Sequence, residues 1–302
     1  MSLAVKYRPA KLKDIVGNES VVQSLRALFE RGEDFPHALL FTGPSGSGKT
    51  TCARIVAKFL KCSEWDFREM NTADFRGIDS AREIIQQMQL SPMNGPCRVW
   101  LLDECSQITK DAQNALLKAL EDCPAHVYFL LATTDPEKLI LTIRTRCITF
   151  TLQALNDNEM SRVIRRASEG EGKPIPQEVT EQIVLDSNGS ARMALSILDS
   201  VIGMEESGML AAARLQAAEA SETIALCRAL IGKKPWREVN RIVSGLTQEP
   251  EQVRRAVLGY AAAVLLKKDE PRAFLILDAF RQDFFTTGNA GLVMACYMVV
   301  TN

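Results

Sequence analysis

A glycine-rich octapeptide constrains the fold of this chain more than any other feature of the sequence. It fits the pattern G-x-x-x-x-G-K-[ST] and consists of Gly43, Pro44, Ser45, Gly46, Ser47, Gly48, Lys49 and Thr50. An apolar run typical of a buried strand, His37–Thr42, directly precedes it, and helical spacing over Lys49–Lys61 directly follows. A glycine-rich turn in this context points backbone N–H groups at anionic oxygens, so the sequence predicts a phosphate loop.

Short apolar runs alternate with helical spacing up to about Gln153. Besides the run before the loop, the expected strands are Arg98–Leu102, Val127–Ala132 and Cys147–Leu152. A further helix is expected over Lys110–Glu121, with Thr109 as its N-cap. This alternation favours βαβ units and a parallel sheet, so we expect a nucleotide-binding α/β domain over residues 1–154.

The rest of the chain shows helical spacing only. Expected helices over Asp157–Ser168, Pro176–Asp186 and Ser190–Gly203 predict a small helical domain at 155–207. After a soft boundary at Met204–Met209, further amphipathic segments predict a second helical domain at 208–302. A length of 302 residues suits such a division into domains.

Polar residues that suit ATP hydrolysis end two of the expected strands. Asp103 and Glu104 follow one apolar strand, where Asp103 would hold Mg²⁺ through water and Glu104 would polarise the attacking water. In the loop, Lys49 would add positive charge at the phosphates and Thr50 would ligate Mg²⁺. Thr134 ends the next strand and could orient water, although paired threonines after a strand also form simple turns.

Composition excludes several classes of protein. The formal net charge is −1, so contacts with nucleic acid must come from local patches. The longest apolar stretch, Tyr260–Leu266, is too short to span a membrane, and we expect a cytoplasmic protein without membrane contact. The eight cysteines form no C-x-x-C pair, which favours reduced core thiols over a zinc site.

The motifs together resemble those of the clamp-loader ATPases, namely the bacterial gamma/tau subunits and the small subunits of replication factor C. The resemblance covers about residues 3–200. It is carried by the phosphate loop, Lys6–Pro9, Asp14–Asn18, Arg76–Asp79, Asp103-Glu104, Ala112–Lys118, Leu131–Pro136, Thr145–Cys147 and Gly189–Arg192. It implies an AAA+ P-loop domain, a helical lid and a helical C-terminal collar, and a subunit that hydrolyses ATP with Mg²⁺ to load a sliding clamp onto primer-template DNA.

The resemblance also implies roles for individual residues. Arg146 would be an arginine finger that reaches a neighbouring subunit's ATP, and Arg192 would contact the phosphates from the lid. From their spacing alone, Arg144 and Arg146 would be an ordinary solvated pair. Gln113 would couple DNA contact to the ATP sites. The residues implied to frame the nucleotide are Tyr7, Arg8, Val16 and Gly17 at the adenine and Gly43–Thr51 at the phosphates.

Three basic residues are candidates for DNA contacts without base readout, namely Arg76, Arg82 and Lys110, and a solvated polar face is the alternative. An apolar stretch within Ile84–Met93 would lie on the clamp-facing side, although burial against the sheet explains it equally well. Partners would be other clamp-loader subunits in a pentameric spiral, homomeric or mixed.

Three features point to the source. The chain lacks a four-cysteine insert between Cys62 and Asp79 and a long C-terminal extension, whereas Leu130–Pro136 looks bacterial. We therefore expect a nucleoid-associated protein from a phage or a divergent bacterium. Two other functions stay open, a non-hydrolysing scaffold subunit of the same fold and an AAA+ DNA motor of another branch.

Overall fold

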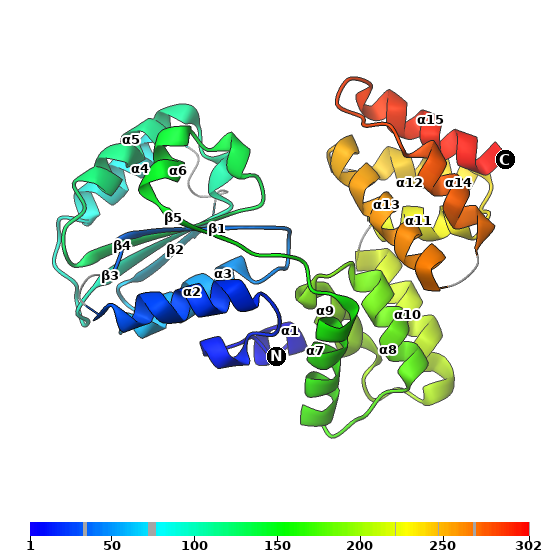
Figure 1. Ribbon diagram of the computed structural model, residues 1–302, viewed down its shortest axis with the longest axis horizontal. Coiled ribbons are helices and arrows are strands. Elements are labelled where there is room, and N and C mark those ends of the chain that lie inside the picture. Colours follow the sequence, from blue (N-terminus) through cyan, green and yellow to red (C-terminus); the bar gives the residue numbers. More distant parts are fainter. Residues whose placement is uncertain (33–34, 72–76, 221, 247, 268–269, 302) are drawn as a thin grey trace. The chain divides into compact units, whose positions relative to one another are not determined.

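The computed structural model describes residues 1–32, 35–71, 77–220, 222–246, 248–267 and 270–301 (Figure 1). Two compact units are present: an α/β unit, Tyr7–Leu155, and a helical unit that combines Met1–Lys6 with Asn156–Asn302. The described helices include none that is long and apolar enough to cross a membrane.

The α/β unit is built on a five-stranded sheet with the order β2-β3-β4-β1-β5, in which all four strand pairs are parallel. The strands are β1 (Ala38–Thr42), β2 (Phe67–Asn71), β3 (Arg98–Asp103), β4 (Val127–Thr133) and β5 (Ile148–Thr151). Four of them lie where the sequence predicts strands, to within one residue at each end. The edge strand β2 was not predicted, because its sequence, FREMN, is mostly polar.

Helices cover both faces of this sheet, with α4, α5 and α6 on one face and α2 and α3 on the other (Figure 1). These helices are α2 (Glu19–Glu30), α3 (Lys49–Phe59), α4 (Ile78–Gln87), α5 (Lys110–Glu121) and α6 (Leu141–Arg146), with short 3-10 turns η1 (Leu12–Asp14), η3 (Cys105–Gln107) and η4 (Pro136–Lys138). Alternate strand residues serve the two faces: Leu40 packs in the core with α4 and α5, and Leu39 in the core with α2 and α3. Burial on both faces explains why the central strands are apolar runs.

The N-cap expected for the helix after β3 is confirmed. The Thr109 side chain accepts a hydrogen bond from the Ala112 N–H at 3.4 Å, and α5 begins at Lys110. Because helices that follow parallel strands begin at the carboxyl edge of the sheet, the starts of α3 and α5 lie at the edge where β1 and β3 end.

The helical unit contains no strand among its described residues. Its helices are α1 (Leu3–Lys6), α7 (Asp157–Gly170), α8 (Gln177–Ser187), α9 (Ala191–Val201), α10 (Glu206–Ala220), α11 (Glu222–Ile231), α12 (Trp236–Gly245), α13 (Pro250–Lys267), α14 (Pro271–Ala279) and α15 (Gly288–Thr301). The first residues join this unit because the Leu3 N–H donates to Asp199 at 3.2 Å and Lys6 pairs with Glu171 at 2.6 Å. The division of 155–302 into a lid and a collar stays a prediction.

A buried polar cluster ties three helices of this unit together. Asp186 of α8 pairs with Arg228 of α11, and it accepts hydrogen bonds from Tyr260 of α13 at 3.4 Å and from Gln182 at 3.0 Å. Burial raises the pKa of the Asp186 carboxyl and also raises that of Tyr260, to about 12. The cluster therefore joins the region predicted as the lid to the region predicted as the collar.

Candidate functional site

The octapeptide after β1 forms a tight loop that only glycine allows at its first position. Gly43 has φ 140°, and a Cβ atom there would come within 2.3 Å of the Leu152 carbonyl oxygen beyond β5. Gly48 caps α3 in a left-handed conformation with φ 104°. The loop therefore lies directly against the chain at the end of β5, and its backbone turns into the first N–H groups of α3, which is the geometry that binds phosphate.

Two side chains of the loop are buried. Lys49 is only 6% exposed, and its Nζ atom donates to the carbonyl oxygens of Gly43 and Pro44 at 2.9 Å each. The Ser47 hydroxyl is buried without a hydrogen-bond partner in the described structure. A buried hydroxyl normally finds a partner, so this one suits a site that an oxygen-rich ligand completes.

Hydrogen bonds connect the start of α3 with the ends of β3 and β4. The Thr50 hydroxyl donates to Asp103 Oδ2 at 2.9 Å, and the Glu104 N–H donates to Asp103 Oδ1 at 3.1 Å. The Thr134 hydroxyl donates to Glu104 Oε2 at 3.3 Å. The four residues that the sequence suggests for metal binding and water activation therefore form one hydrogen-bonded chain.

Backbone geometry fixes the direction of the two carboxylates. Asp103 is the last residue of β3, whereas Glu104 adopts a left-handed conformation with φ 52° and ψ 40° before η3 begins. Both side chains are partly exposed, so solvent and ligand reach them. Asp135 Oδ2, 3.4 Å from the Thr134 hydroxyl, is an alternative acceptor for its one hydrogen, and this acidic neighbour was not predicted as part of the site.

The residues present fit Mg²⁺ and a nucleoside triphosphate. Thr50 Oγ1 and Asp103 Oδ2 are oxygen atoms 2.9 Å apart, and Mg²⁺ prefers oxygen ligands supplied by one or two protein side chains together with phosphate. The buried ammonium of Lys49 and the N-terminus of α3 supply positive charge beside them.

The segment implied to frame the adenine lies beside the same part of the chain. Gly17 is buried, and Tyr7, Arg8 and Val16 are partly exposed. The neighbouring Asn18 belongs to a motif that carries the resemblance, but no role in the site was predicted for it. Its side chain bridges to Gln153, donating to the carbonyl oxygen at 3.2 Å and accepting from the N–H at 2.7 Å. Leu152 lies against Gly43, so the segment ending at Asn18 and the loop share one neighbouring stretch of chain.

Arg146 is the last residue of α6 and lies on the surface of the α/β unit. Its guanidinium pairs with Glu121, the last residue of α5, and donates through Nη1 to the Thr142 carbonyl oxygen at 2.9 Å. The Thr145 hydroxyl donates to the same oxygen at 3.2 Å. The pair with Glu121 was not predicted, because the two residues are 25 positions apart and no local pattern connects them.

Gln113 is buried in the first part of α5 and connects two loops. Its Nε2 atom donates to the carbonyl oxygens of Ile108 at 3.0 Å and Lys138 at 3.3 Å, and its Oε1 atom accepts from the Ile140 N–H at 2.9 Å. The first loop follows Asp103 and Glu104, and the second leads into α6 and Arg146. Gln113 therefore holds these two loops at a fixed separation.

Two of the candidate DNA contacts are described: Arg82 lies within α4, and Lys110 is the first residue of α5. Arg82 and Lys110 are exposed, and Arg82 pairs with Asp79 at 3.1 Å. Arg76 lies outside the described residues. In the helical unit, Arg192 is exposed in the first turn of α9, which Ser190 caps by accepting from the Met193 N–H. The predicted contact of Arg192 with phosphates stays a prediction.

The apolar stretch before β3 divides between core and surface. Ile84 and Met88 are 1% exposed and pack in the core with α5, whereas Leu90 and Met93 are 60% and 66% exposed. Leu90 and Met93 are therefore the residues of the stretch that a partner could contact most readily.

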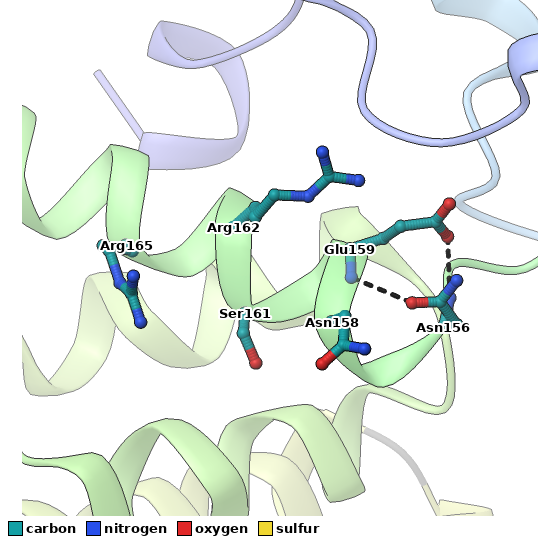
Figure 2. A pocket seen from close by; sticks show the side chains of 6 residues that line it. All are labelled: Asn156, Asn158, Glu159, Ser161, Arg162 and Arg165. Carbon is teal, nitrogen blue, oxygen red and sulfur yellow. Dashed lines mark hydrogen bonds between the residues drawn. The ribbon is translucent and has the colours of Figure 1, made fainter.

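A separate pocket of about 380 Å³ lies on α7 of the helical unit, lined by Asn156, Asn158, Glu159, Ser161, Arg162 and Arg165 (Figure 2). Asn156 and Glu159 are engaged in a capping box at the start of the helix. Figure 2 shows the guanidinium groups of Arg162 and Arg165 pointing in different directions rather than converging on one point. The pocket therefore lacks the geometry to hold a single phosphate group.

The sequence is similar to those of known clamp-loader subunits. It is 33% identical over 225 residues to the DNA polymerase III subunit gamma/tau of Mycobacterium tuberculosis, covering 67% of this chain and 39% of that protein. It is 35% identical over 198 residues to the replication factor C small subunit of Halobacterium salinarum, covering 65% of this chain and 61% of that protein. The family described as "DNA polymerase III, delta subunit" matches residues 66–156. The resemblance indicated by the motifs is confirmed.

The chain spans about two fifths of the mycobacterial relative and about three fifths of the haloarchaeal one. Among solved structures, it resembles the RuvB Holliday junction branch migration motor of Thermotoga maritima, with a TM-score of 0.60 and 23% identity over 89% of this chain and 90% of that chain. An identity this low shows the fold alone. The fold is that of an AAA+ P-loop domain joined to helical regions, as the sequence predicted.

Proposed function

We propose that this chain, a relative of the clamp-loader subunits with the AAA+ fold, is an ATP-hydrolysing subunit that opens a sliding clamp and loads it onto primer-template DNA. The observation that carries the proposal is the hydrogen-bonded chain Thr50–Asp103–Glu104–Thr134 beside the phosphate loop. The sequence similarity to gamma/tau and replication factor C subunits directs the choice among AAA+ functions.

In this proposal the loop from Gly43 to Thr51 binds the phosphates of ATP. Lys49 would turn from the loop carbonyls to the β- and γ-phosphates, where its charge stabilises the bound nucleotide. Tyr7, Arg8, Val16 and Gly17 would frame the adenine. Mg²⁺ bound by Thr50 and Asp103 would neutralise charge on the phosphate oxygens.

Glu104 would orient and polarise the attacking water in line with the γ-phosphate. Its Oε2 atom already accepts from Thr134 at 3.3 Å, so the hydroxyl would hold that oxygen in place and the other oxygen would polarise the water. Thr134 would thereby position the base and hold water near the γ-phosphate. The left-handed backbone at Glu104 sets the direction of the side chain.

Hydrolysis would depend on assembly because Arg146 acts on the ATP of a neighbouring subunit. A guanidinium supplied in trans stabilises charge on the transferred phosphoryl group, and no single chain completes its own site. Arg192 would contact the phosphates of its own subunit's nucleotide. Gln113 would couple the loops after β3 and before α6, so that DNA contact near the start of α5 reaches the ATP site.

The proposed assembly is a pentameric spiral held together by the C-terminal helices, acting in the cytoplasm near the nucleoid. Arg76, Arg82 and Lys110 would contact the DNA backbone inside the spiral. Leu90 and Met93, the exposed part of the apolar stretch, would face the sliding clamp. The contacts of the three basic residues with phosphates would hold DNA without reading its sequence.

Steady-state ATPase assays with the assembled complex test the proposal. Primed DNA and a sliding clamp added together should stimulate hydrolysis well beyond either alone. Equal stimulation by DNA without a clamp would instead indicate an AAA+ DNA motor of another branch.

A non-hydrolysing subunit is the second candidate, favoured by the match of residues 66–156 to a family described as a DNA polymerase III delta subunit. The Lys49, Thr50, Asp103 and Glu104 side chains oppose it, because a scaffold has no need of a water-activating carboxylate. Binding of ATP without turnover in the complete complex, in the presence of clamp and primed DNA, would decide for the scaffold.

A further inference from the structure

Helix α6 is fastened to helix α5 at both of its ends. At its start, Gln113 of α5 accepts from the N–H of Ile140, the N-cap of α6, at 2.9 Å. At its end, Arg146 pairs with Glu121, the last residue of α5. Because α6 has only six residues, these two connections fix both its position and the direction of its last side chain.

The guanidinium of Arg146 is held from two sides. Nη1 donates to the Thr142 carbonyl oxygen one turn earlier at 2.9 Å, and Nη2 donates to the Glu121 carboxylate. An arginine carries five N–H donors in a planar fork, so a group held through two of them still presents others to a phosphate. The Arg146 side chain remains 34% exposed, which leaves room for such a ligand.

We propose that Glu121 is a positioning residue that orients Arg146 for the neighbouring subunit's ATP, an inference that rests on the proposed function above. A long surface arginine samples many rotamers, and a partner that selects one of them places the guanidinium before the phosphate arrives. Small displacements of a catalytic group cost large factors in rate, so orientation matters more here than the stability of the ion pair. The pair is half-exposed and adds little to folding, which allows the arginine to adjust as the phosphate binds.

The chain supplies a matched control on the same helix. Arg144 pairs with Glu137 at 3.5 Å, and the Glu137 side chain is 85% exposed. This pair has the same residue types and also involves an arginine of α6, but it does not involve Arg146. Removing the Glu137 carboxylate therefore measures the effect of a lost surface ion pair without disturbing the proposed arginine finger.

The first test compares kcat and KM for ATP between variants. The assembled complex is purified from the source cells by an affinity tag on the full chain, and clamp and primed DNA are added. Glu121→Ala should lower kcat about tenfold, because Arg146 is no longer oriented, and leave KM unchanged. Glu121→Asp, which keeps the charge, should recover part of the loss. Glu137→Ala should change kcat less than about twofold. Melting temperatures should stay equal to that of the wild type for all three variants.

The second test asks whether Glu121 acts through Arg146. In an Arg146→Ala background, where residual hydrolysis is followed with radiolabelled ATP over hours, Glu121→Ala should cause no further loss, because the group that it positions is gone. A full tenfold loss in that background would overturn the inference and assign Glu121 a role that does not pass through the arginine.

The remaining outcomes separate this inference from the proposed function. If Arg146→Ala abolishes hydrolysis but Glu121→Ala does not lower kcat, the arginine finger stands and the positioning role of Glu121 is wrong. If Arg146→Ala hydrolyses ATP at the wild-type rate in the complex, both assignments fall. A rise in KM with unchanged kcat for Glu121→Ala would also overturn the positioning role.

Discussion

An aspartate is buried beside an arginine in the α/β unit, and another in the helical unit, but the pKa values of the two carboxyl groups shift in opposite directions. Asp66, just before β2, accepts from the N–H groups of Met93 at 2.7 Å and Asn94 at 3.0 Å and from the Ser63 hydroxyl at 2.7 Å. Arg98 lies 3.6 Å away. Burial by itself would raise the pKa of Asp66, but these donors and the arginine outweigh it and lower the pKa to about 2.

In the described part of the helical unit, the donors to Asp186 are the side chains of Gln182, Arg228 and Tyr260. Burial there outweighs the hydrogen bonds and the arginine, and the pKa of Asp186 is raised. The two sites therefore differ in which contribution dominates: backbone N–H groups, a hydroxyl and an arginine outweigh burial at Asp66, whereas burial outweighs the side-chain donors at Asp186.

The largest expected effect concerns the α/β unit. Lys49→Ala should abolish ATP binding because the buried charge at the phosphates is lost. Glu104→Gln should preserve binding and lower turnover by about 10²- to 10⁴-fold, since the carboxylate that activates water is gone. Nucleotide binding and steady-state hydrolysis measure the two steps, with Lys58→Ala, an exposed position of α3, as the control. Wild-type hydrolysis by Glu104→Gln would refute the assignment.

The next effect concerns the stability of the helical unit. Arg228→Ala should lower the free energy of unfolding by about 3 kcal/mol, because Asp186 is left as a buried charge without its cationic partner. Denaturant titration followed by circular dichroism measures the loss. Arg214→Ala, which removes an exposed hydrogen bond to Gln182, should cost far less. Equal losses in the two variants would mean that Asp186 does not depend on Arg228.

A pH series tests the opposite pKa shifts directly. Because the pKa of Asp66 is lowered from 3.8 to about 2, its ionised form contributes stability above pH 3.8 that is lost as the pH falls toward 2. The full contribution is about 2 kcal/mol. For Asp186 the sign is reversed: a raised pKa means that the carboxyl favours folding most when protonated, and that this advantage is lost as the pH rises through its pKa.

Melting temperatures of the wild type, Asp66→Asn and Asp186→Asn between pH 2 and pH 5 check this contrast. The difference between the wild type and Asp66→Asn should shrink as the pH falls. The difference in melting temperature between the wild type and Asp186→Asn should not shrink as the pH falls. If both differences follow the same course, the two carboxyl groups have the same kind of environment.

The smallest effect concerns DNA contacts at the α/β unit. Arg82→Ala and Lys110→Ala should each reduce the slope of log K against log salt by about one counterion, because each removes one phosphate contact. Fluorescence anisotropy with a primed duplex measures the slope. Arg237→Ala, an exposed position of the helical unit, is the control and should leave it unchanged. Unchanged slopes for Arg82 and Lys110 would place both on a solvated face.

The sequence predicts helices and strands in both units, but it predicts a contact between distant residues only where parallel-sheet geometry applies. Parallel strands bring their carboxyl ends to one edge, so Thr50 and Asp103, which are 53 positions apart, were expected to meet there, as they do. The edge strand β2 escaped prediction because it lacks the apolar pattern of the central strands. Ile84 and Leu90 belong to one apolar stretch, but only tertiary packing decides that the first is buried and the second exposed.

Contacts between side chains on separate helices carry no sequence signal. Glu121 and Arg146 meet because α5 and α6 pack side by side, and Asp186 meets Tyr260 across 74 positions. Asn18 and Gln153 are 135 positions apart and meet because the chain after β5 returns to the start of the unit. In each pair the residue types are ordinary surface types, and only the folded arrangement gives them a partner.

Because the backbone at Glu104 is left-handed, the residue that would be most stable at this position is not the residue that hydrolysis requires. A residue with a side chain is less stable in this conformation by about 1–2 kcal/mol than in the right-handed one, and glycine escapes that cost. Glycine would also remove the carboxylate. Selection for a more stable chain and selection for turnover therefore favour different residues at position 104, and a search for thermostable variants would tend to return inactive proteins altered there.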